Sequence, residues 1–521
     1  MRSSAYREKG TVPFLSGYNQ GVKIERSNAV RLVRFLVGLF FRRVEVTGVE
    51  RVPKTGGGIL IAWHPNGLVD PALIISGFPR RVVFGARHGL FSWPIVGRLM
   101  RALGTVPIFR ATDSKDGDVE ARREANRKSL DAMAQAVCDG GFAALFPEGV
   151  SHDDPFLQEL KTGAARLYYR AKQLCGENGV PPVIIPVGLH YDDKTMFRSD
   201  VLVEFHAPLA LPSELVAPIP EGDDETLRAR SSELTQVLEP VLQEVTHATE
   251  SWELNQLMGR VRSLVRAERA KRAGTSLKAP DMAERSLGMA RVWKAYYARL
   301  QTDPDGVQAL LDRVEAYDAA LLEVKLEDDD LDKPPPIESK WLPVLLAAQA
   351  AVVFLVIPPV LVLGLLINAA PYFLINVLSR IASRQYKDTA TIKLLTGLIL
   401  FPLAWLIFAL LVGLGQIELH NSFEEIARAP WRAGITTFLI GAFGGALALI
   451  YLELVRRTWT SIKIRAKRQW GSTIIRRLSA ERAALYQAIE EMRAGLELPG
   501  DVLGDGRVGT RDFALDPEDM P

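Results

Sequence analysis

The chain has 521 residues, of which 48% are hydrophobic, and its formal net charge is +2. This length exceeds one ordinary domain, so two or three structural parts are expected. We expect no nucleic-acid partner. The only two cysteines, Cys138 and Cys175, exclude a disulfide-stapled class of protein, and we expect both to pack in helices of a reducing compartment.

The N-terminal part of the chain is polar. Residues 1–29 form a polar segment in which we expect no signal peptide. The first apolar stretch, Leu32 to Phe41, is interrupted by Arg34 and is too short to cross a bilayer. It predicts either an interfacial helix or an amphipathic helix of the core, and the sequence favours neither.

A histidine and an aspartate follow the next apolar run. Gly58 to Trp63 predicts a short buried strand, which the following Pro-Asn-Gly breaks, so His64 lies at the strand end. Asp70 begins a predicted helix, where an acidic residue suits the helix dipole. The carboxylate can then hold one ring nitrogen of His64 while the other acts as a base toward a hydroxyl. No nucleophile-elbow pattern accompanies the pair, so the attacking hydroxyl is expected to be the substrate's own; taken alone, the pattern also fits a strand cap and a helix cap.

Two more apolar runs end in polar residues. Val106 to Phe109 predicts a buried strand, and Arg110 at its end suits bidentate recognition of a phosphate. Phe142 to Phe146 predicts another strand, directly followed by the turn Pro147 to Gly149. In an open α/β sheet, ligands bind beyond the carboxyl ends of the strands, where all three motifs fall. We therefore expect the motifs to line one cleft.

These blocks resemble those of the glycerolipid acyltransferases, the superfamily of glycerol-phosphate and lysophosphatidate acyltransferases. The family's blocks are H-x-x-x-x-D, G-x-x-F-I-x-R, F-P-E-G and an apolar V-x-P-V strand. The similar segments here are His64 to Asp70, Gly104 to Arg110, Phe146 to Gly149, and Val183 to Gly188. The resemblance covers about residues 30–215 and implies an α/β catalytic domain, with a mixed sheet flanked by helices.

The resemblance also implies roles for single residues. His64 would be the general base, Asp70 the group that orients it, and Pro186 would shape the acyl-donor side. The residues that would bind the glycerol phosphate of the acceptor are Arg110, Glu148 and Gly149. The donor would be acyl-CoA or an acyl-carrier protein, and neither a metal nor another cofactor is expected.

Two departures from the family pattern point to one sub-branch. One extra residue separates His64 from Asp70, and Val150 to Asp153 replaces the Thr-Arg that often follows the third block. The fungal glycerol-3-phosphate/dihydroxyacetone-phosphate acyltransferases have H-x-N-x-x-V-D-P and F-P-E-G-x-S-H-D, followed by L-K-x-G. The residues here that fit this branch are Asn66, Val69, Ser151, His152, Asp153, Lys161 and Gly163. The members of this set that we add to the expected substrate-binding residues are Asn66, Ser151, His152 and Lys161.

The catalytic pattern stops after residue 215. Residues 216–326 predict a charged helical region, and residues 327–340 an exposed acidic and proline-rich linker. Residues 457–496 predict an amphipathic helix that is either solvated or self-associating, which makes it a candidate for homo-oligomerisation. Residues 497–521 are rich in Gly and Asp and predict a disordered tail.

Residues 341–456 predict a C-terminal α-helical transmembrane domain. Its apolar segments are 342–357, 360–378, 394–415 and 433–455. The last two are each long enough for a bilayer of ~30 Å, whereas the first two are short, so a hairpin and a single broken span are both considered.

Loop charge distinguishes the two topologies. Residues 379–393 carry four basic residues and residues 456–468 carry six, against two in residues 416–432. The positive-inside rule places both basic segments on the cytoplasmic face with the catalytic domain, which requires a hairpin at Pro358-Pro359 and four spans.

Three functions remain open at this point. The leading one is transfer of a fatty acyl group, in phospholipid synthesis, to glycerol 3-phosphate, dihydroxyacetone phosphate, or a lysophospholipid such as lysophosphatidate. A metal-dependent phosphohydrolase is disfavoured, because the histidines lack ligand spacing and Arg110 suits a substrate phosphate better. Its imagined ligands would be His64, Asp70, Glu148, His152 and Asp153. A non-catalytic lipid-binding membrane protein is the third, and the intact motif set disfavours it.

Overall fold

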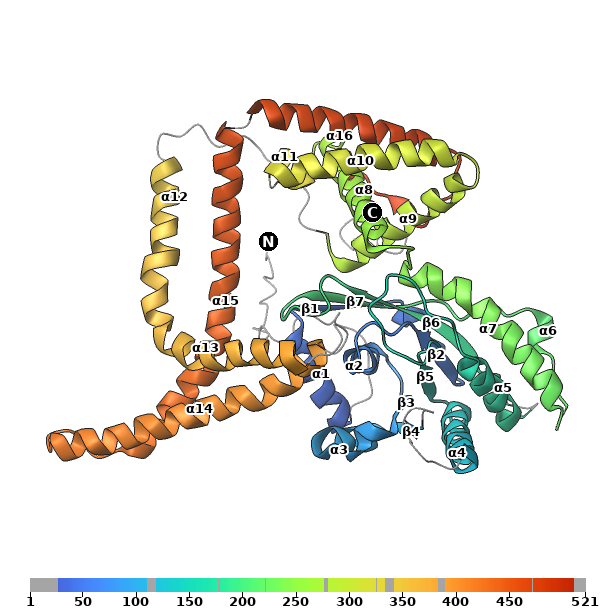
Figure 1. Cartoon of the computed structure of the whole chain (residues 1–521), viewed down its shortest axis with the longest axis horizontal. Coiled ribbons are helices and arrows are strands. Elements are labelled where there is room, and N and C mark those ends of the chain that lie inside the picture. Colours follow the sequence, from blue (N-terminus) through green and yellow to red (C-terminus); the bar gives the residue numbers. More distant parts are fainter. Residues whose placement is uncertain are drawn as a thin grey trace, which may run out of the picture. The chain divides into compact units, whose positions relative to one another are not determined.

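The structure is a computed structural model that describes residues 27–109, 119–176, 179–220, 222–275, 280–324, 326–332, 342–382, 389–470 and 472–509. The chain forms two compact units (Figure 1). The first comprises residues 1–255, 280–290 and 386–391, and the second comprises residues 256–279, 291–385 and 392–521.

The first unit is built on a seven-stranded sheet in the order β1-β7-β6-β2-β5-β3-β4. Its strands are β1 (Arg43–Thr47), β2 (Gly58–Ala62), β3 (Val82–Arg87), β4 (Val106–Ile108), β5 (Phe142–Leu145), β6 (Val183–Tyr191) and β7 (Asp200–Phe205). Neighbouring strands pair in parallel except β6 and β7, which are antiparallel. A mixed sheet flanked by helices is the fold class that the sequence predicts.

Helices cover both faces of this sheet. They are α1 (Asn28–Phe40), α2 (Val69–Gly77), α3 (Pro94–Ala102), α4 (Val119–Cys138), α5 (Gly163–Cys175), α6 (Ser213–Val216) and α7 (Asp224–Thr246), with 3₁₀ turns η1 (Val49–Arg51) and η2 (His88–Ser92). The central strand β2 is apolar and buried throughout, as expected for a parallel strand covered on both sides.

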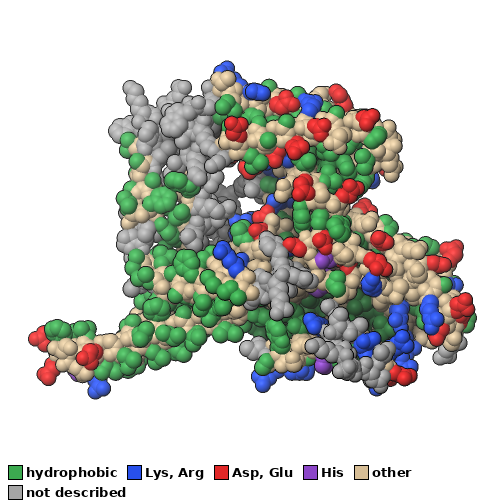
Figure 2. All heavy atoms as spheres, viewed as in Figure 1, with side chains coloured by type: hydrophobic (Ala, Val, Ile, Leu, Met, Phe, Trp, Pro, Cys, Tyr) green, Lys and Arg blue, Asp and Glu red, His purple; other side chains and the backbone are tan. Residues whose placement is uncertain are grey.

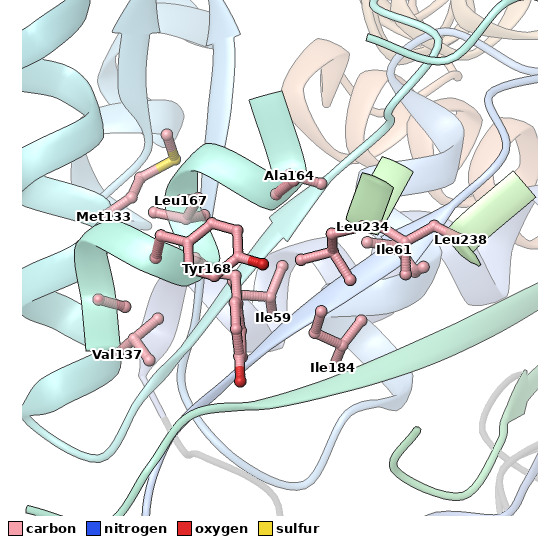
Figure 3. Close-up of a cluster of buried hydrophobic side chains, with 14 of the residues drawn as sticks. Ile59, Ile61, Met133, Val137, Ala164, Leu167, Tyr168, Ile184, Leu234 and Leu238 are labelled. Carbon is pink, nitrogen blue, oxygen red and sulfur yellow. The ribbon is translucent and has the colours of Figure 1, made fainter. Parts of the chain in front are cut away.

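The main core of this unit lies between the sheet and helices α4, α5 and α7. Figure 3 shows Ile59 and Ile61 of β2 beside Leu167 of α5 and Leu234 and Leu238 of α7. The leucines of α7 are spaced four residues apart, so they form one apolar stripe that faces this core. The predicted domain boundary at residue 215 therefore falls inside the first unit, because α7 completes the hydrophobic core on this face of the sheet.

Helix α1 is amphipathic. Its buried residues are Val30, Val33, Val37 and Phe40. Leu32 and Phe35 on the other side are 47% and 53% exposed. The helix thus contributes one face to the core, as one of the two alternatives predicts, while an interfacial role for the exposed residues stays a prediction.

The expectation that the two cysteines are unpaired is wrong. Cys138 and Cys175 do lie in helices, at the last residues of α4 and α5, but they form a disulfide with a Cα–Cα distance of 5.2 Å. The two helices pack side by side on the same face of the sheet, and this packing brings together residues that are 37 positions apart.

Three histidines, His190, His206 and His247, lie close together beside β6 and β7. The rings of His190 and His247 are tilted against each other with centroids 4.8 Å apart, and each has Nε2 within hydrogen-bond reach of the Ser286 hydroxyl, at 3.4 and 3.2 Å. Ser286 in turn donates to Glu204 Oε2 at 3.2 Å. Burial, followed by the nearby His206, lowers the pKa of His247 to about 4, and burial also lowers the pKa of His190 and of His206.

Acid should therefore destabilise this unit for two reasons: its carboxylates become protonated, and its buried neutral histidines gain a proton on unfolding. A histidine with a lowered pKa stays neutral in the folded state, so its contribution to stability is intact above pH ~6.5 and is lost as the pH falls toward about 4. We expect His247→Asn to flatten the fall in melting temperature between pH 7.5 and 5.0. Asparagine tolerates the left-handed backbone at this position, where φ is 53°. His88→Asn, which changes an exposed histidine of the same unit, is the control; equal slopes for the two variants would contradict the expectation.

The remaining elements are helical apart from one small hairpin. They are α8 (Trp252–Arg272), α9 (Met282–Leu300), α10 (Pro304–Val324), α11 (Asp328–Leu331), α12 (Leu342–Ala351), a π-helix η4 (Val352–Val356), α13 (Ile357–Ala382), α14 (Thr389–Ser422), α15 (Pro430–Trp470), α16 (Ser472–Arg493), β8 (Asp501–Val502) and β9 (Val508–Gly509).

The helix predicted over residues 457–496 is divided, because its first part continues α15 to Trp470 and its later part forms α16. Leu478, Leu485 and Tyr486 of α16 are buried in one cluster with residues of α8, α10 and α11. The apolar face that makes this helix a candidate for homo-oligomerisation is therefore covered by its own unit.

The acidic segment is not the exposed linker that the sequence predicts. Asp328 and Asp330 are buried in α11, and Asp328 pairs with Arg260 at 2.8 Å and accepts a hydrogen bond from the Tyr317 hydroxyl at 2.7 Å. Charge complementarity to arginines of the bundle folds this segment. Residues 333–340, the rest of the predicted linker, lie outside the described residues.

The predicted disordered tail is ordered in its first part. Strands β8 and β9 pair antiparallel, and Arg291 of α9 donates to the carbonyl groups of Pro499 and Gly500 at 2.7 Å. These long-range hydrogen bonds fix a segment whose composition predicts disorder. Residues 510–521 lie outside the described residues.

The apolar region forms long helices with many exposed hydrophobic side chains. Two stretches, Gly364–Ile381 and Thr391–Ser422, are long and apolar enough to cross a membrane, and only 6% of the second is buried. Figure 2 shows hydrophobic side chains gathered along α13 and α14. The structure has no loop at Pro358-Pro359, because helical residues continue from Leu342 to Ala382; the two prolines directly follow the π-helix η4. The number of spans stays a prediction.

Helices α13, α14 and α15 meet at a buried amide. Asn368 donates to the Gly441 carbonyl at 2.8 Å and accepts a hydrogen bond from the Trp405 indole at 3.0 Å. Nearby, a Cβ on Gly364 would lie 2.8 Å from the Gly444 Cα, so α13 and α15 approach closely only because both positions are glycine.

Candidate active site

The candidate site lies at the carboxyl ends of three neighbouring strands. In the sheet, β2 lies between β5 and β6 and runs parallel to both. His64 follows β2, Glu148 follows β5, and Tyr191 is the last residue of β6. Polar side chains that follow parallel strands share one edge of the sheet, which is where ligands bind in α/β folds.

His64 and Asp70 face each other as the sequence predicts. The Nδ1 atom of His64 lies 2.8 Å from Asp70 Oδ2, and the same oxygen accepts a hydrogen bond from the Asn66 backbone N–H at 2.7 Å. Asp70 is completely buried in the first turn of α2, so the extra residue of this loop does not separate the pair. Because Asp70 engages Nδ1, the nitrogen left to act toward a substrate is Nε2.

The ring of His64 is held flat against an aromatic wall. It stacks on Phe146 with a centroid distance of 3.9 Å and an angle of 7° between the planes. Phe146 opens the third motif directly after β5, so the F-P-E-G turn supports the base as well as carrying polar groups. The stack and the hydrogen bond to Asp70 together fix the imidazole orientation.

Glu148 and His152 form a second buried pair. His152 Nε2 contacts Glu148 Oε2, and the His152 backbone N–H donates to the His64 carbonyl at 3.1 Å. Glu148 is 2% exposed, and its other oxygen, Oε1, accepts no hydrogen bond from the described residues. An unpaired carboxylate oxygen is costly to bury, so it is a natural acceptor for a hydroxyl of a bound ligand.

The turn after Glu148 requires glycine. Gly149 has φ of +73°, a backbone conformation that other residues rarely adopt. The Gly149 backbone N–H closes the turn by donating to the Phe146 carbonyl at 3.0 Å, and the Lys161 backbone N–H donates to the Pro147 carbonyl at 2.8 Å. The Lys161 ammonium pairs with Glu159 at 2.7 Å and is 60% exposed, so the structure places the backbone of Lys161 at the site and its charge at the surface.

Of the remaining predicted site residues, two lie in the loops of the site, one lies within the sheet and one is outside the described residues. Asn66 is buried in the His64 loop, and Ser151 is half-buried in the segment that follows the Gly149 turn. Pro186 is buried within β6, opposite Ile61 of β2, so it lies in the sheet and not at its edge. Arg110 lies outside the described residues, which stop at Phe109 and resume at residue 119.

Sequence reasoning missed two residues of this site. The Tyr191 hydroxyl donates to Asp70 Oδ1, and Lys194 forms an ion pair with Asp153 and accepts a hydrogen bond from the Asn66 side chain through its carbonyl at 3.0 Å. Both follow the apolar fourth block, at the carboxyl end of a predicted strand. The rule that located His64 and Glu148 would have located Tyr191 too.

The acidic and histidine side chains of the site are engaged with one another. Both oxygens of Asp70 accept hydrogen bonds from protein groups, and His152 pairs with Glu148. Within the described part of the chain, no three His, Cys, Asp or Glu side chains are arranged to hold a metal ion.

Comparison with known proteins identifies the region that carries the site. Residues 43–190 match the protein family described as Acyltransferase. An uncharacterized acyltransferase of Schizosaccharomyces pombe is 25% identical over 36% of this chain and 39% of its own length. Glycerol-3-phosphate O-acyltransferase 1 of Saccharomyces cerevisiae is 31% identical over 35% of this chain and 22% of its own length. The chain thus spans less than half the length of these relatives.

One solved structure aligns with part of this chain. It is the crystal structure of the 1-acyl-sn-glycerophosphate (LPA) acyltransferase PlsC from Thermotoga maritima, with 19% identity and a TM-score of 0.27. The alignment covers 41% of this chain and 78% of that one.

Proposed function

Because residues 43–190 are an acyltransferase domain of the glycerolipid acyltransferase superfamily, we propose that the protein transfers a fatty acyl group from an acyl thioester to a hydroxyl of glycerol 3-phosphate or dihydroxyacetone phosphate. The observation that carries this proposal is the His64–Asp70 pair, with 2.8 Å between Nδ1 and Oδ2 and with Nε2 left for a substrate.

The reaction needs one base and one acid, and one imidazole supplies both. His64 Nε2 takes the proton of the acceptor hydroxyl while its oxygen forms a bond to the thioester carbonyl carbon. The tetrahedral intermediate collapses with cleavage of the C–S bond, and the leaving thiolate takes the proton from Nε2. The products are an ester and a free thiol. Asp70 accepts the Nδ1 hydrogen bond throughout, which stabilises the imidazolium form between the two transfers.

Recognition of the acceptor is proposed to involve Glu148 and Arg110. The free Oε1 of Glu148 accepts a hydrogen bond from a second hydroxyl of the acceptor, and Arg110 binds its phosphate, for which a guanidinium has the matching geometry. The proposed donor is acyl-CoA or acyl-carrier protein. The likeness to the yeast glycerol-3-phosphate O-acyltransferases favours the small phosphorylated acceptors over lysophosphatidate.

We also propose that the protein is an integral membrane protein with its catalytic domain on the cytoplasmic face. Support comes from the two apolar helical stretches Gly364–Ile381 and Thr391–Ser422 and from the excess of basic residues in residues 379–393 and 456–468. An acyltransferase at the bilayer surface would release its acylated product directly into the lipid phase.

An assay with defined acceptors tests the function. Full-length protein in detergent is given acyl-CoA or acyl-carrier protein with glycerol 3-phosphate, dihydroxyacetone phosphate or lysophosphatidate, and thiol release and lipid product are measured. We expect product with at least one of the first two acceptors and only background release in their absence. Product from lysophosphatidate alone would overturn the acceptor assignment. No thiol release with any pair would overturn acyl transfer.

A further inference from the structure

The end of β6 and the segment that follows it contact the His64–Asp70 pair and its loop. Tyr191 is the last residue of β6, and its hydroxyl donates to Asp70 Oδ1, the carboxylate oxygen that does not face His64. The other oxygen, Oδ2, already accepts from His64 Nδ1 and from the Asn66 backbone N–H, at 2.8 and 2.7 Å. Each oxygen of this fully buried carboxylate therefore has its own donor.

We propose that Tyr191 is a positioning residue for the acyl transfer, because its hydroxyl fixes the Asp70 carboxylate in the one orientation that holds His64 Nδ1. A carboxylate can rotate about the bond that joins it to its side chain, and a second donor on the opposite oxygen removes that freedom. The inference rests on the proposed function in taking His64 as the base.

The backbone around Tyr191 is itself held at several points. The Asp192 N–H donates to the Asp200 carbonyl at 3.0 Å, and Arg42 forms a two-pronged ion pair with the Asp200 carboxylate at 2.9 and 2.7 Å. The Tyr191 ring lies against Phe41, with centroids 6.0 Å apart. These contacts place the hydroxyl with little freedom to move, which a positioning role requires.

The same connection makes a second contact with the catalytic loop. The Asn66 side chain donates to the Lys194 carbonyl at 3.0 Å, and the Lys194 ammonium pairs with Asp153. The segment that begins at Tyr191 thus bonds to the loop after β2 and to the loop after β5. It ties together the two loops that carry His64 and Glu148.

The Tyr191 hydroxyl remains a donor under all conditions in which the enzyme is expected to work. Burial and, after it, the negative charge of Asp70 raise the pKa of Tyr191 well above its usual value. The phenol therefore does not compete with His64 as a base. Its contribution is a hydrogen bond to a charged acceptor, a class of contact that is stronger than a hydrogen bond between neutral groups.

The test compares Tyr191→Phe with Tyr169→Phe. Tyr169 is another buried tyrosine of the same unit, and its hydroxyl contacts only the Arg230 carbonyl, at 3.5 Å, among the contacts found in the described chain. We expect Tyr191→Phe to lower kcat roughly tenfold to hundredfold with little change in KM for either substrate, because substrate contacts are retained. We expect Tyr169→Phe to leave kcat near the wild-type value.

The pH dependence separates positioning from a general structural effect. Without the phenol, the Asp70 charge concentrates on the oxygen that faces His64, so protons bind the pair more tightly. The acidic limb of the kcat/KM profile should move to higher pH in Tyr191→Phe alone. A lowered kcat with an unmoved acidic limb, or an unchanged kcat, would overturn the inference.

A measurement that does not depend on acyl transfer tests the role of Tyr191 separately from the proposed function. Diethylpyrocarbonate modifies neutral imidazole, so the pH midpoint of His64 modification, followed by mass spectrometry, reports the proton affinity of the pair. We expect the midpoint to rise in Tyr191→Phe and to stay at the wild-type value in Tyr169→Phe. If wild-type protein transfers no acyl group, the proposed function fails while this measurement still decides the role of Tyr191. Equal midpoints in all three proteins would overturn that role.

Discussion

Replacing His64 with alanine is expected to lower acyl transfer by roughly 10²- to 10⁴-fold while leaving the fold intact. Nε2 of His64 is the base in the proposed reaction, and its ring is held by Asp70 at 2.8 Å and by the face of Phe146 at 3.9 Å. The neighbouring His152 does not replace it, because its Nε2 is bonded to Glu148. The assay is thiol release at saturating acceptor, and the melting temperature checks the fold.

His88→Ala is the matched control for this substitution. His88 is an exposed histidine of the same unit, stacked on Phe109 with ring centroids 4.4 Å apart, and it contacts neither Asp70 nor Glu148 in the described residues. It should retain turnover within a few-fold of wild type. Turnover of His64→Ala close to that of His88→Ala would refute the assignment of the base.

Replacing Arg482 with alanine is expected to destabilise the second unit by about 3–5 kcal/mol, because it removes a fully buried guanidinium that pairs with the buried carboxylate of Glu268. Arg482 of α16 is fully buried and bonds to Glu268 at 3.1 Å, to the Asp328 carbonyl at 2.8 Å, and to Asp332. The carboxylates of Glu268 and Asp332 would keep only part of their compensation after the change. The measurement is thermal unfolding of the full-length protein in detergent, with a shift on the order of 10 °C expected.

Arg477→Ala supplies the control on the same helix, since Arg477 is exposed and a surface substitution changes stability by only about 0.5 kcal/mol. Adding Glu268→Ala to Arg482→Ala should recover part of the loss, because it removes one of the unpaired charges. A melting temperature of Arg482→Ala equal to that of Arg477→Ala would show that the buried pairs are not what holds α16 to its unit.

The candidate site divides into a part that is local in sequence and a part that is not. His64 and Asp70 are six residues apart, and a strand end followed by a helix start suffices to predict that they face each other. The stacking of Phe146 on His64 and the hydrogen bond from Tyr191 to Asp70, 121 residues away in the chain, depend on β2 lying between β5 and β6. Strand order is not encoded in the periodicity of any one strand, so spacing alone could not show these contacts.

By itself the sequence determined the strand ends that carry His64 and Glu148, the helical character of the apolar region, and the α/β class, because hydrophobic period and turn residues act over a few neighbouring positions. Only the tertiary structure decided that α7 completes the hydrophobic core on one face of the sheet, that Cys138 meets Cys175, and that Asp328 is buried. Each of these outcomes depends on which distant surface covers an apolar face or neutralises a charge. The acidic run Glu327 to Asp330 predicts a solvent-exposed segment when only its sequence is considered. In the structure, the packing of α8 against the bundle brings Arg260 close to Asp328, and the two residues pair.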